Sequence, residues 1–424
     1  MDIKENLEKT QYINGLDGIR GIFCFMVVTH HLPVNILRLP FPLGLSFLQC
    51  FFILSGYLIS SILIQQKELP FKKYLGRFYL NRFFRIVPLY FFYLLIISLV
   101  GFLFRNNPME NNLGIWKDLL QNWKLYMSFT SSYSEWYNYS HDKEYYLSIV
   151  NAHLWSLSVE MQFYILFPFV VYFLSIRQIK WLLVVVIIAT PFLRLICYSN
   201  LNDTLPLVSA TLAHYEKKEL LGWILHHSSV FQLDAFATGA CLAFFNFSKL
   251  RINKKALWIL IVICIVVLSV NYSQDMRTGN YDSWLDCIYS HTMLIRHHHY
   301  FYLLTMSNVI AAILIYLTVN GNGFKLFEHP YSVGLGKISY SMYILQFFVL
   351  VVYMILVFIG GLIFGFNFQD FMRGKIGFEL LYITGYMILL ITISRFTYEF
   401  IELRFTRIGK KVKSKLEAKN RMGI

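Results

Sequence analysis

The sequence predicts an all-α integral membrane protein with about ten transmembrane helices and both termini in the cytoplasm. Hydrophobic residues make up 57% of the 424 residues and charged residues only 15%, more apolar surface than a soluble fold of this size can bury. Ten apolar runs are long enough to cross a bilayer, which takes about 20 residues each. Basic residues gather in alternate connections between these runs, which is typical of cytoplasmic loops.

The ten expected spans cover almost the whole chain. Their approximate limits are 18–37, 42–64, 84–104, 153–174, 181–199, 228–247, 256–272, 300–320, 334–359 and 377–401. With a cytoplasmic N-terminus, the inner segments hold 25 Lys and Arg residues and the outer segments 11. This excess favours a multi-pass protein in a lipid bilayer, with a transmembrane domain over 1–403 and a basic cytoplasmic tail over 404–424.

The net charge of +14 does not indicate nucleic acid. The basic residues form short clusters between apolar runs and not stripes interleaved with exposed aromatic residues. None of the six cysteines forms a CxxC pair, so we interpret them as small buried hydrophobes. The first 15 residues are polar and charged, so no cleavable signal peptide is expected.

The first run, "LDGIRGIFCFMVVTHHLP", carries ionisable groups at both ends. Asp17 precedes Arg20 by three residues and can pair with it on a helix. Arg20 and His31 share a helical face, about 16 Å apart, whereas His30 points away from that face. Ionisable side chains inside a membrane usually face a cavity or a partner, although a single histidine can also be structural.

The second and third runs each contain a pattern with two interpretations. In "FFILSGYLIS", Ser55 and Gly56 favour close helix approach. In "RFYLNRFFRIVPLY", Arg82 and Arg85 lie on one face at the start of the third span. They are either ordinary cytoplasmic arginines or a fork for phosphate, which arginine binds bidentately.

The fourth run, "AHLWSLSVEMQFYILFP", places Glu160 about two turns from the outer end of its helix, where it can pair with an imidazole or an arginine. The preceding segment contains "SYSEWYNYSHDKEYY", whose aromatic rings could stack on sugars or anchor at the membrane interface.

Two motifs in the second half of the chain have ordinary explanations. In "GKISYSMYILQFFV", Tyr340 and Tyr343 share a helical face, which is more often a packing feature than a catalytic one. The outer-loop histidines 297–299 suggest a metal site, but consecutive residues rarely supply three good ligands, so no metal is expected.

Taken in order, these pieces resemble the acyltransferase-3 family of integral membrane acyltransferases. The resemblance covers nearly the whole chain and rests on "LDGIRGI…HH", "FFILSGYLI", "RFFRIVPLY", "LWSLSVEMQFY", "ISYSMYI" and "YEFIELRF". Many relatives have a histidine where this chain has Gln346, and many end in an "IEKPF"-like sequence where this chain has "IELRF". Some also carry an extracytoplasmic esterase-like domain, which we do not expect in this chain.

The resemblance implies about ten helices and transfer of an acyl group, most often acetyl, from cytoplasmic acetyl-CoA. The implied acceptor is a hydroxyl of a cell-surface glycan or its lipid-linked precursor, and the implied location is the bacterial cytoplasmic membrane. The family's Arg-x10-His pattern matches Arg20 and His31, and its Arg-x-x-Arg pattern matches Arg82 and Arg85. Its Trp-Ser-Leu-x-x-Glu pattern ends at Glu160.

These matches give each candidate residue a role. His31 is the expected general base or transient acyl carrier, and Glu160 would orient its imidazole. Donor phosphates are expected to bind Arg20, Arg82 and Arg85, and the acceptor is expected to contact His30 and Trp155. A transporter or flippase is the alternative, because ten spans with buried charges also suit a carrier, although residues 1–200 and 201–400 show no convincing repeat.

Overall fold

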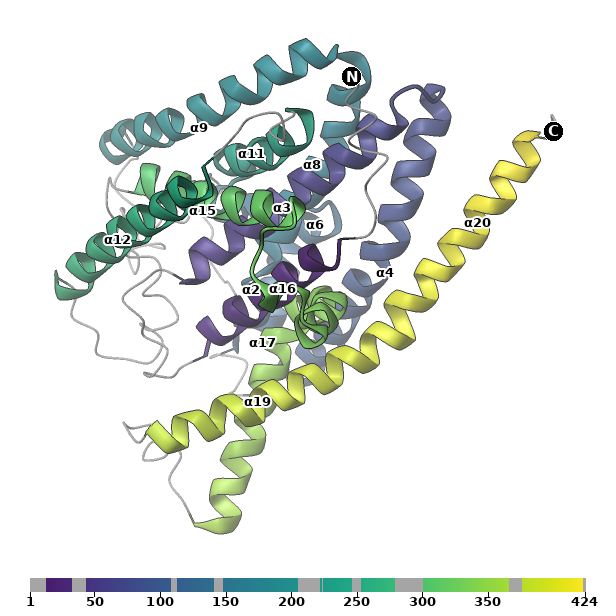
Figure 1. Cartoon of the computed structure of the whole chain (residues 1–424). Coiled ribbons are helices and arrows are strands. Elements are labelled where there is room, and N and C mark those ends of the chain that lie inside the picture. The colour runs from purple at the N-terminus through teal and green to yellow at the C-terminus, as the bar shows by residue number, and fades with distance from the viewer. Residues whose placement is uncertain are drawn as a thin grey trace. The chain divides into compact units, whose positions relative to one another are not determined.

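The protein is helical throughout the part of the chain that the structure, a computed structural model, describes (Figure 1). Those residues are 13–32, 43–107, 113–140, 148–204, 222, 224–245, 253–278, 300–365 and 376–421. The α-helices are α2 (Asn14–His30), α3 (Leu43–Gln66), α4 (Phe71–Phe104), α6 (Ile115–Met127), α7 (Ser134–Ser140), α8 (Leu154–Phe173), α9 (Ile176–Thr204), α11 (Leu233–Phe244), α12 (Lys254–Thr278), α15 (Tyr300–Val319), α16 (Lys325–Glu328), α17 (Pro330–Phe364), α19 (Ile376–Thr397) and α20 (Leu403–Arg421). Short 3-10 turns, η1 (Ser131–Tyr133), η2 (Ile149–Asn151) and η4 (Ser229–Gln232), precede α7, α8 and α11, and a π-helical turn, η7 (Tyr398–Glu402), joins α19 to α20.

Seven of the described helical segments are long and apolar enough to cross a membrane. They are Phe47–Gln66, Phe71–Phe104, Ile149–Phe173, Ile176–Ser199, Tyr302–Val319, Pro330–Ile363 and Gly377–Glu417. Large apolar side chains such as Trp181 and Ile188 are exposed on α9, as expected of helices that face hydrocarbon. The all-α membrane class is therefore confirmed.

The other three expected spans also coincide with helices. They fall on α2, on the shorter apolar segment Ser229–Phe244 and on α12. The first expected span reaches residue 37, but α2 ends at His30, and residues 33–42 lie outside the described part of the chain. The count of ten and the cytoplasmic position of both termini remain predictions.

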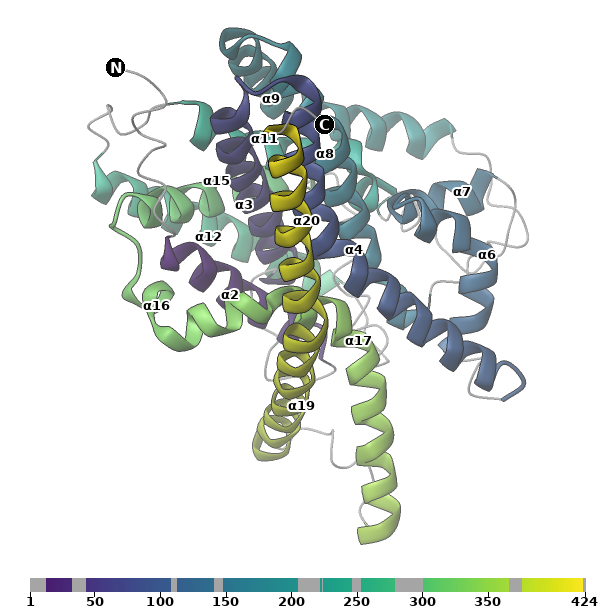
Figure 2. The same cartoon turned by 90° about the vertical axis from the view of Figure 1, so that its right-hand side faces the viewer.

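The helices fall into two compact units. The first comprises Met1–Ile62, Asn122–Tyr146 and His153–Lys337, and the second comprises Leu63–Gln121, Leu147–Ala152 and Ile338–Ile424. In the first unit α11 packs against both α9 and α15, and α2 packs against α16. In the second, α20 runs along α4 (Figure 2), so residues 404–421 of the segment expected to be a basic tail form a helix that packs against α4.

Glycines set the closest helix contacts in the first unit. A Cβ atom at Gly56 would lie 2.2 Å from the carbonyl oxygen of Phe236, and one at Gly239 would lie 1.9 Å from that of Ile53. The helices α3 and α11 therefore touch backbone to backbone, which confirms the close approach predicted at Ser55–Gly56. Gly18 of the motif "LDGIRGI" makes a similar close contact between α2 and α16. A Cβ atom there would lie 1.7 Å from the carbonyl oxygen of Phe327.

We expect Gly239→Ala to lower the melting temperature of the detergent-solubilised protein. The added methyl group would force α3 and α11 apart, and overpacking of this kind costs about 1–3 kcal/mol. Gly334→Ala in α17 is the matched control, because a Cβ there meets no described atom within 4 Å, so its melting temperature should equal or exceed that of the wild type. Equal melting temperatures for the two variants would contradict the close crossing.

Candidate active site

Arg20 is held by Asp17 near the start of α2. Its Nη1 atom lies 2.6 Å from Asp17 Oδ1, and both side chains are largely buried. The pair predicted from the three-residue spacing is therefore confirmed. The carboxylate fixes the direction of the guanidinium through a charge-assisted hydrogen bond.

His30 and His31 lie at the opposite end of α2. His30 is the last helical residue, and His31 follows with helical backbone angles and a backbone N–H bond of 3.2 Å to the carbonyl oxygen of Val28. Their ring centroids are 6.1 Å apart, and both side chains are half-buried. The helical rise separates Arg20 from His31 by about 16 Å, so these two residues serve opposite ends of one helix.

Glu160 forms a hydroxyl-rich cluster between α3 and α8. Ser55 Oγ and Tyr164 Oη both donate hydrogen bonds to Glu160 Oε1, and the two hydroxyl oxygens lie 3.2 Å apart. Two donors on one carboxylate oxygen hold the side chain in a single orientation. Both of these hydrogen-bond partners of Glu160 are hydroxyl groups, and the predicted imidazole contact remains a proposal.

Trp155 lies at the start of α8 among two histidines that the sequence analysis did not select. Its indole stacks on the imidazole of His227, with centroids 4.4 Å apart and planes at 29°, and the centroid of His226 lies 4.6 Å away. His227 Nδ1 in turn lies 2.6 Å from Glu135 Oε1 on α7. The structure thus builds a buried aromatic and ionisable cluster around a residue of the tryptophan–glutamate motif.

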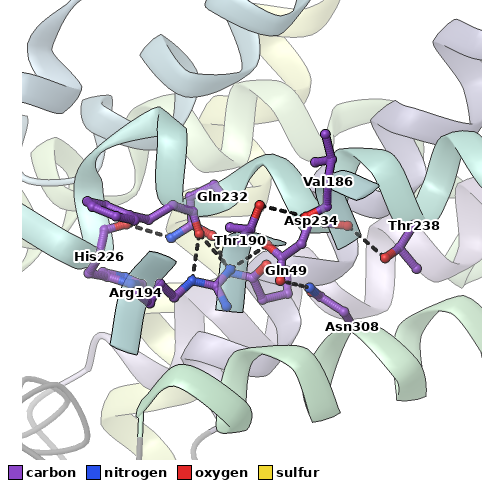
Figure 3. Close-up of polar contacts among 10 residues, drawn as sticks. Gln49, Val186, Thr190, Arg194, His226, Gln232, Asp234, Thr238 and Asn308 are labelled. Atoms are coloured by element: carbon purple, nitrogen blue, oxygen red, sulfur yellow. Dashed lines mark hydrogen bonds and ion pairs between the residues drawn. The ribbon is translucent and has the colours of Figure 1, made fainter. Parts of the chain in front are cut away.

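A buried ion pair joins α9 to α11 (Figure 3). Arg194 on α9 bonds to Asp234 on α11 with both side chains 1% exposed, and its Nε atom donates to the carbonyl oxygen of Phe231 at 2.8 Å. Asn308 on α15 donates to the second carboxylate oxygen of Asp234 at 3.1 Å. A buried pair of charges is stable only when such additional hydrogen bonds satisfy it, and this one ties three helices of the first unit together.

The arginine pair lies in the second unit, on α4, which begins at Phe71 and therefore carries both arginines inside one helix. Arg85 is exposed and Arg82 is half-buried, with its guanidinium carbon 5.8 Å from the centroid of the Phe78 ring. Arg85 interacts electrostatically with Glu402, a buried residue of η7 whose Oε1 atom accepts a hydrogen bond from Ser341 Oγ. A π-helical turn frequently marks a functional site, and here it brings a carboxylate toward the arginine motif.

The remaining tyrosine motif also contacts this region. Tyr340 Oη on α17 donates a hydrogen bond of 2.8 Å to the carbonyl oxygen of Ile86, the residue after Arg85. Packing was the expected role of this tyrosine, and the bond anchors α17 to α4 within the second unit. Histidines 297–299 lie outside the described residues, and the described part of the chain contains no group of three or more His, Cys, Asp or Glu residues placed to hold a metal ion.

The buried ion pair of Arg194 and Asp234 could have been predicted from the sequence. Arg194 and Asp234 are charged residues inside apolar runs, which normally face a partner, so each of them predicts a counterion. Glu135 and His227 lie in connections between expected spans, where charged and aromatic residues are ordinary. Nothing in their spacing predicts that they meet.

A helical membrane fold with these motifs defines a class of protein, and the sequence comparison identifies it: the chain belongs to the acyltransferase-3 family. Residues 13–399 match this family, which is described as an acyltransferase domain.

The O-acetyltransferase OatA of Staphylococcus aureus strain NCTC 8325 / PS 47 is 30% identical over 176 residues, which are 41% of this chain and 27% of that relative. The peptidoglycan O-acetyltransferase OatA of Listeria monocytogenes serovar 1/2a is 30% identical over 183 residues, 42% of this chain and 27% of that relative. The match with these relatives therefore spans about a quarter of their length, and no solved structure matches the chain significantly.

Proposed function

We propose that the protein is an O-acetyltransferase of the bacterial cytoplasmic membrane that moves an acetyl group from cytoplasmic acetyl-CoA to a hydroxyl of a cell-surface glycan or its lipid-linked precursor. The observation that carries this proposal is the family match over residues 13–399. Two relatives named O-acetyltransferases support the acetyl group, and the word peptidoglycan in one name supports a glycan acceptor.

The chemistry needs one base. The acceptor oxygen attacks the carbonyl carbon of the thioester, a C–O bond forms, and the C–S bond breaks. His31 takes the hydroxyl proton and returns it to the departing thiolate, so that the products are an acetyl ester and free CoA. A neutral imidazole suits this role near pH 7.

The other candidate residues bind and orient the two substrates. Arg20, Arg82 and Arg85 hold the phosphates of the donor, for which guanidinium is suited because it binds phosphate bidentately. Glu160, fixed by Ser55 and Tyr164, orients the reacting imidazole. Trp155 and His30 contact the acceptor, which enters from the outer side or laterally from the bilayer.

Proteoliposomes distinguish this enzyme from a transporter. The purified protein is reconstituted with a soluble N-acetylglucosamine oligosaccharide as acceptor probe, with or without acetyl-CoA. We expect the oligosaccharide to gain the mass of an acetyl group only when acetyl-CoA is present, and to stay outside the vesicles when it is absent. Uptake of the oligosaccharide without donor, and no ester with donor, would contradict the enzyme and favour the carrier.

A further inference from the structure

The pair formed by Glu135 and His227 has no part in the mechanism above. The two side chains are only 2% exposed, and His227 Nδ1 lies 2.6 Å from Glu135 Oε1. Taking a carboxylate and an imidazole out of water is costly unless the geometry is good. This distance is that of a carboxylate that orients a histidine, as in catalytic and metal sites.

The pair fixes the indole of Trp155. The His227 ring is held at its Nδ1 edge by the carboxylate, and one of its faces stacks on the indole (centroids 4.4 Å apart, planes at 29°). The centroid of the His226 ring lies 4.6 Å from that of the indole, with the planes at 60°, and the Phe52 ring meets the indole edge-on at 6.3 Å. With these neighbours, Trp155 is only 8% exposed, so its indole has little room to move.

The segment that carries the two histidines is itself anchored (Figure 3). Gln232 Nε2 donates to the carbonyl oxygen of His226 at 2.6 Å, and Gln49 Nε2 on α3 donates to Gln232 Oε1 at 2.7 Å. The carbonyl oxygen of Phe231 accepts from Arg194. The chain from His226 to Gln232 is therefore fixed by α3 and α9, and the histidines keep their positions relative to α8.

The cluster also has a fixed place relative to the candidate catalytic residues of α8. Trp155 precedes Glu160 by five positions on the same helix, which is about 7.5 Å along its axis. On α3, Phe52 contacts Trp155, and Ser55, three residues further on, donates its hydroxyl hydrogen bond to Glu160. An error in the position of the indole would thus change how a molecule bound against it meets Glu160.

We infer that Glu135 and His227 are positioning residues for the acceptor. The carboxylate of Glu135 orients the imidazole of His227, and the imidazole orients the indole of Trp155, which contacts the acceptor glycan. This inference rests on the proposed function, and it separates the acceptor half of the site from the arginines that bind the donor. A pair that merely joins α7 to the segment before η4 would instead affect stability and both substrates equally.

Steady-state kinetics with acetyl-CoA and the soluble N-acetylglucosamine oligosaccharide test the inference. Glu135→Ala and His227→Ala should raise the acceptor KM at least about tenfold, because a displaced indole weakens binding of the acceptor and each factor of ten in affinity is about 1.4 kcal/mol. The KM for acetyl-CoA should stay close to the wild-type value. Glu135→Gln, which still accepts a hydrogen bond from the imidazole, should restore most of the lost acceptor affinity.

Two further variants keep the test decisive if the alanine variants fail to fold. His227→Gln retains a hydrogen-bond donor for Glu135 but loses the ring, so it should raise the acceptor KM like His227→Ala. Trp155→Phe combined with His227→Gln should be no worse than the more severe single variant, because both act through the same indole. Asn138→Ala is the control, since this buried residue of α7 donates its hydrogen bond to Asn122 at 3.2 Å.

The outcomes are distinct. An unchanged acceptor KM in His227→Gln, or equal increases in the acceptor and donor KM values, would overturn the inference. A wild-type protein that forms no ester would overturn the proposed function itself.

Discussion

The His31→Ala variant is expected to bind acetyl-CoA but to transfer acetyl groups at least about 100-fold more slowly than the wild type, because positioned general bases contribute about 100-fold to 10,000-fold. His31 lies at the C-terminal end of α2, about three turns from the Arg20–Asp17 pair. Removing the imidazole leaves this pair intact, so donor binding should survive the substitution. The rate is followed as acetyl ester formed on the oligosaccharide, with protein that elutes as a single folded species.

His329→Ala is the matched control for this experiment. His329 is an exposed histidine at the end of α16, and its ring stacks on Tyr331 at 5.3 Å. This variant should retain the wild-type transfer rate. Normal transfer by His31→Ala would show that another residue is the base, and the buried histidines of the first unit would be the next candidates.

The Asp234→Leu variant is expected to show the largest loss of stability. Arg194 would keep its bonds to the Phe231 carbonyl oxygen but would lose its counterion in a fully buried position. Removing one partner of a buried ion pair costs about 3–5 kcal/mol. Asn308 would lose an acceptor as well. Equilibrium unfolding in mixed micelles measures the difference in free energy.

The double variant Arg194→Met/Asp234→Leu shows whether the cost comes from the stranded charge. Replacing both members of a buried pair by apolar residues is often neutral or stabilising, so the double variant should recover most of the lost stability. A double variant as unstable as Asp234→Leu would mean that shape, and not charge, maintains the contact of α9 with α11.

The membrane class and several local contacts could be predicted from the sequence because they depend on short-range patterns. Apolar runs of about 20 residues predict helices, and the spacing of Asp17 and Arg20 predicts their ion pair, which the structure confirms. The same holds for Gly56, since a small residue inside an apolar helix favours close contact with a neighbour.

Contacts between distant segments could not be predicted in this way. Glu135 and His227 are separated by 92 positions, and neither belongs to a periodic pattern, so only the packing of α7 and the segment before η4 brings them together. The hydroxyl partners of Glu160 were missed for a different reason, since one of them, Tyr164, is only four residues away on α8. An imidazole or a guanidinium was the expected partner of a membrane carboxylate, whereas two neutral hydroxyl groups, from Ser55 and Tyr164, donate to it.

The most direct test of the account is the stoichiometry of the wild-type reaction. Purified protein is incubated with radiolabelled acetyl-CoA and the N-acetylglucosamine oligosaccharide, and free thiol and labelled ester are measured in the same samples. The account predicts that one thiol is released for each base-labile acetyl ester that forms on the oligosaccharide. Neither thiol nor ester above the level of a protein-free sample would contradict acetyl transfer from acetyl-CoA to a glycan hydroxyl.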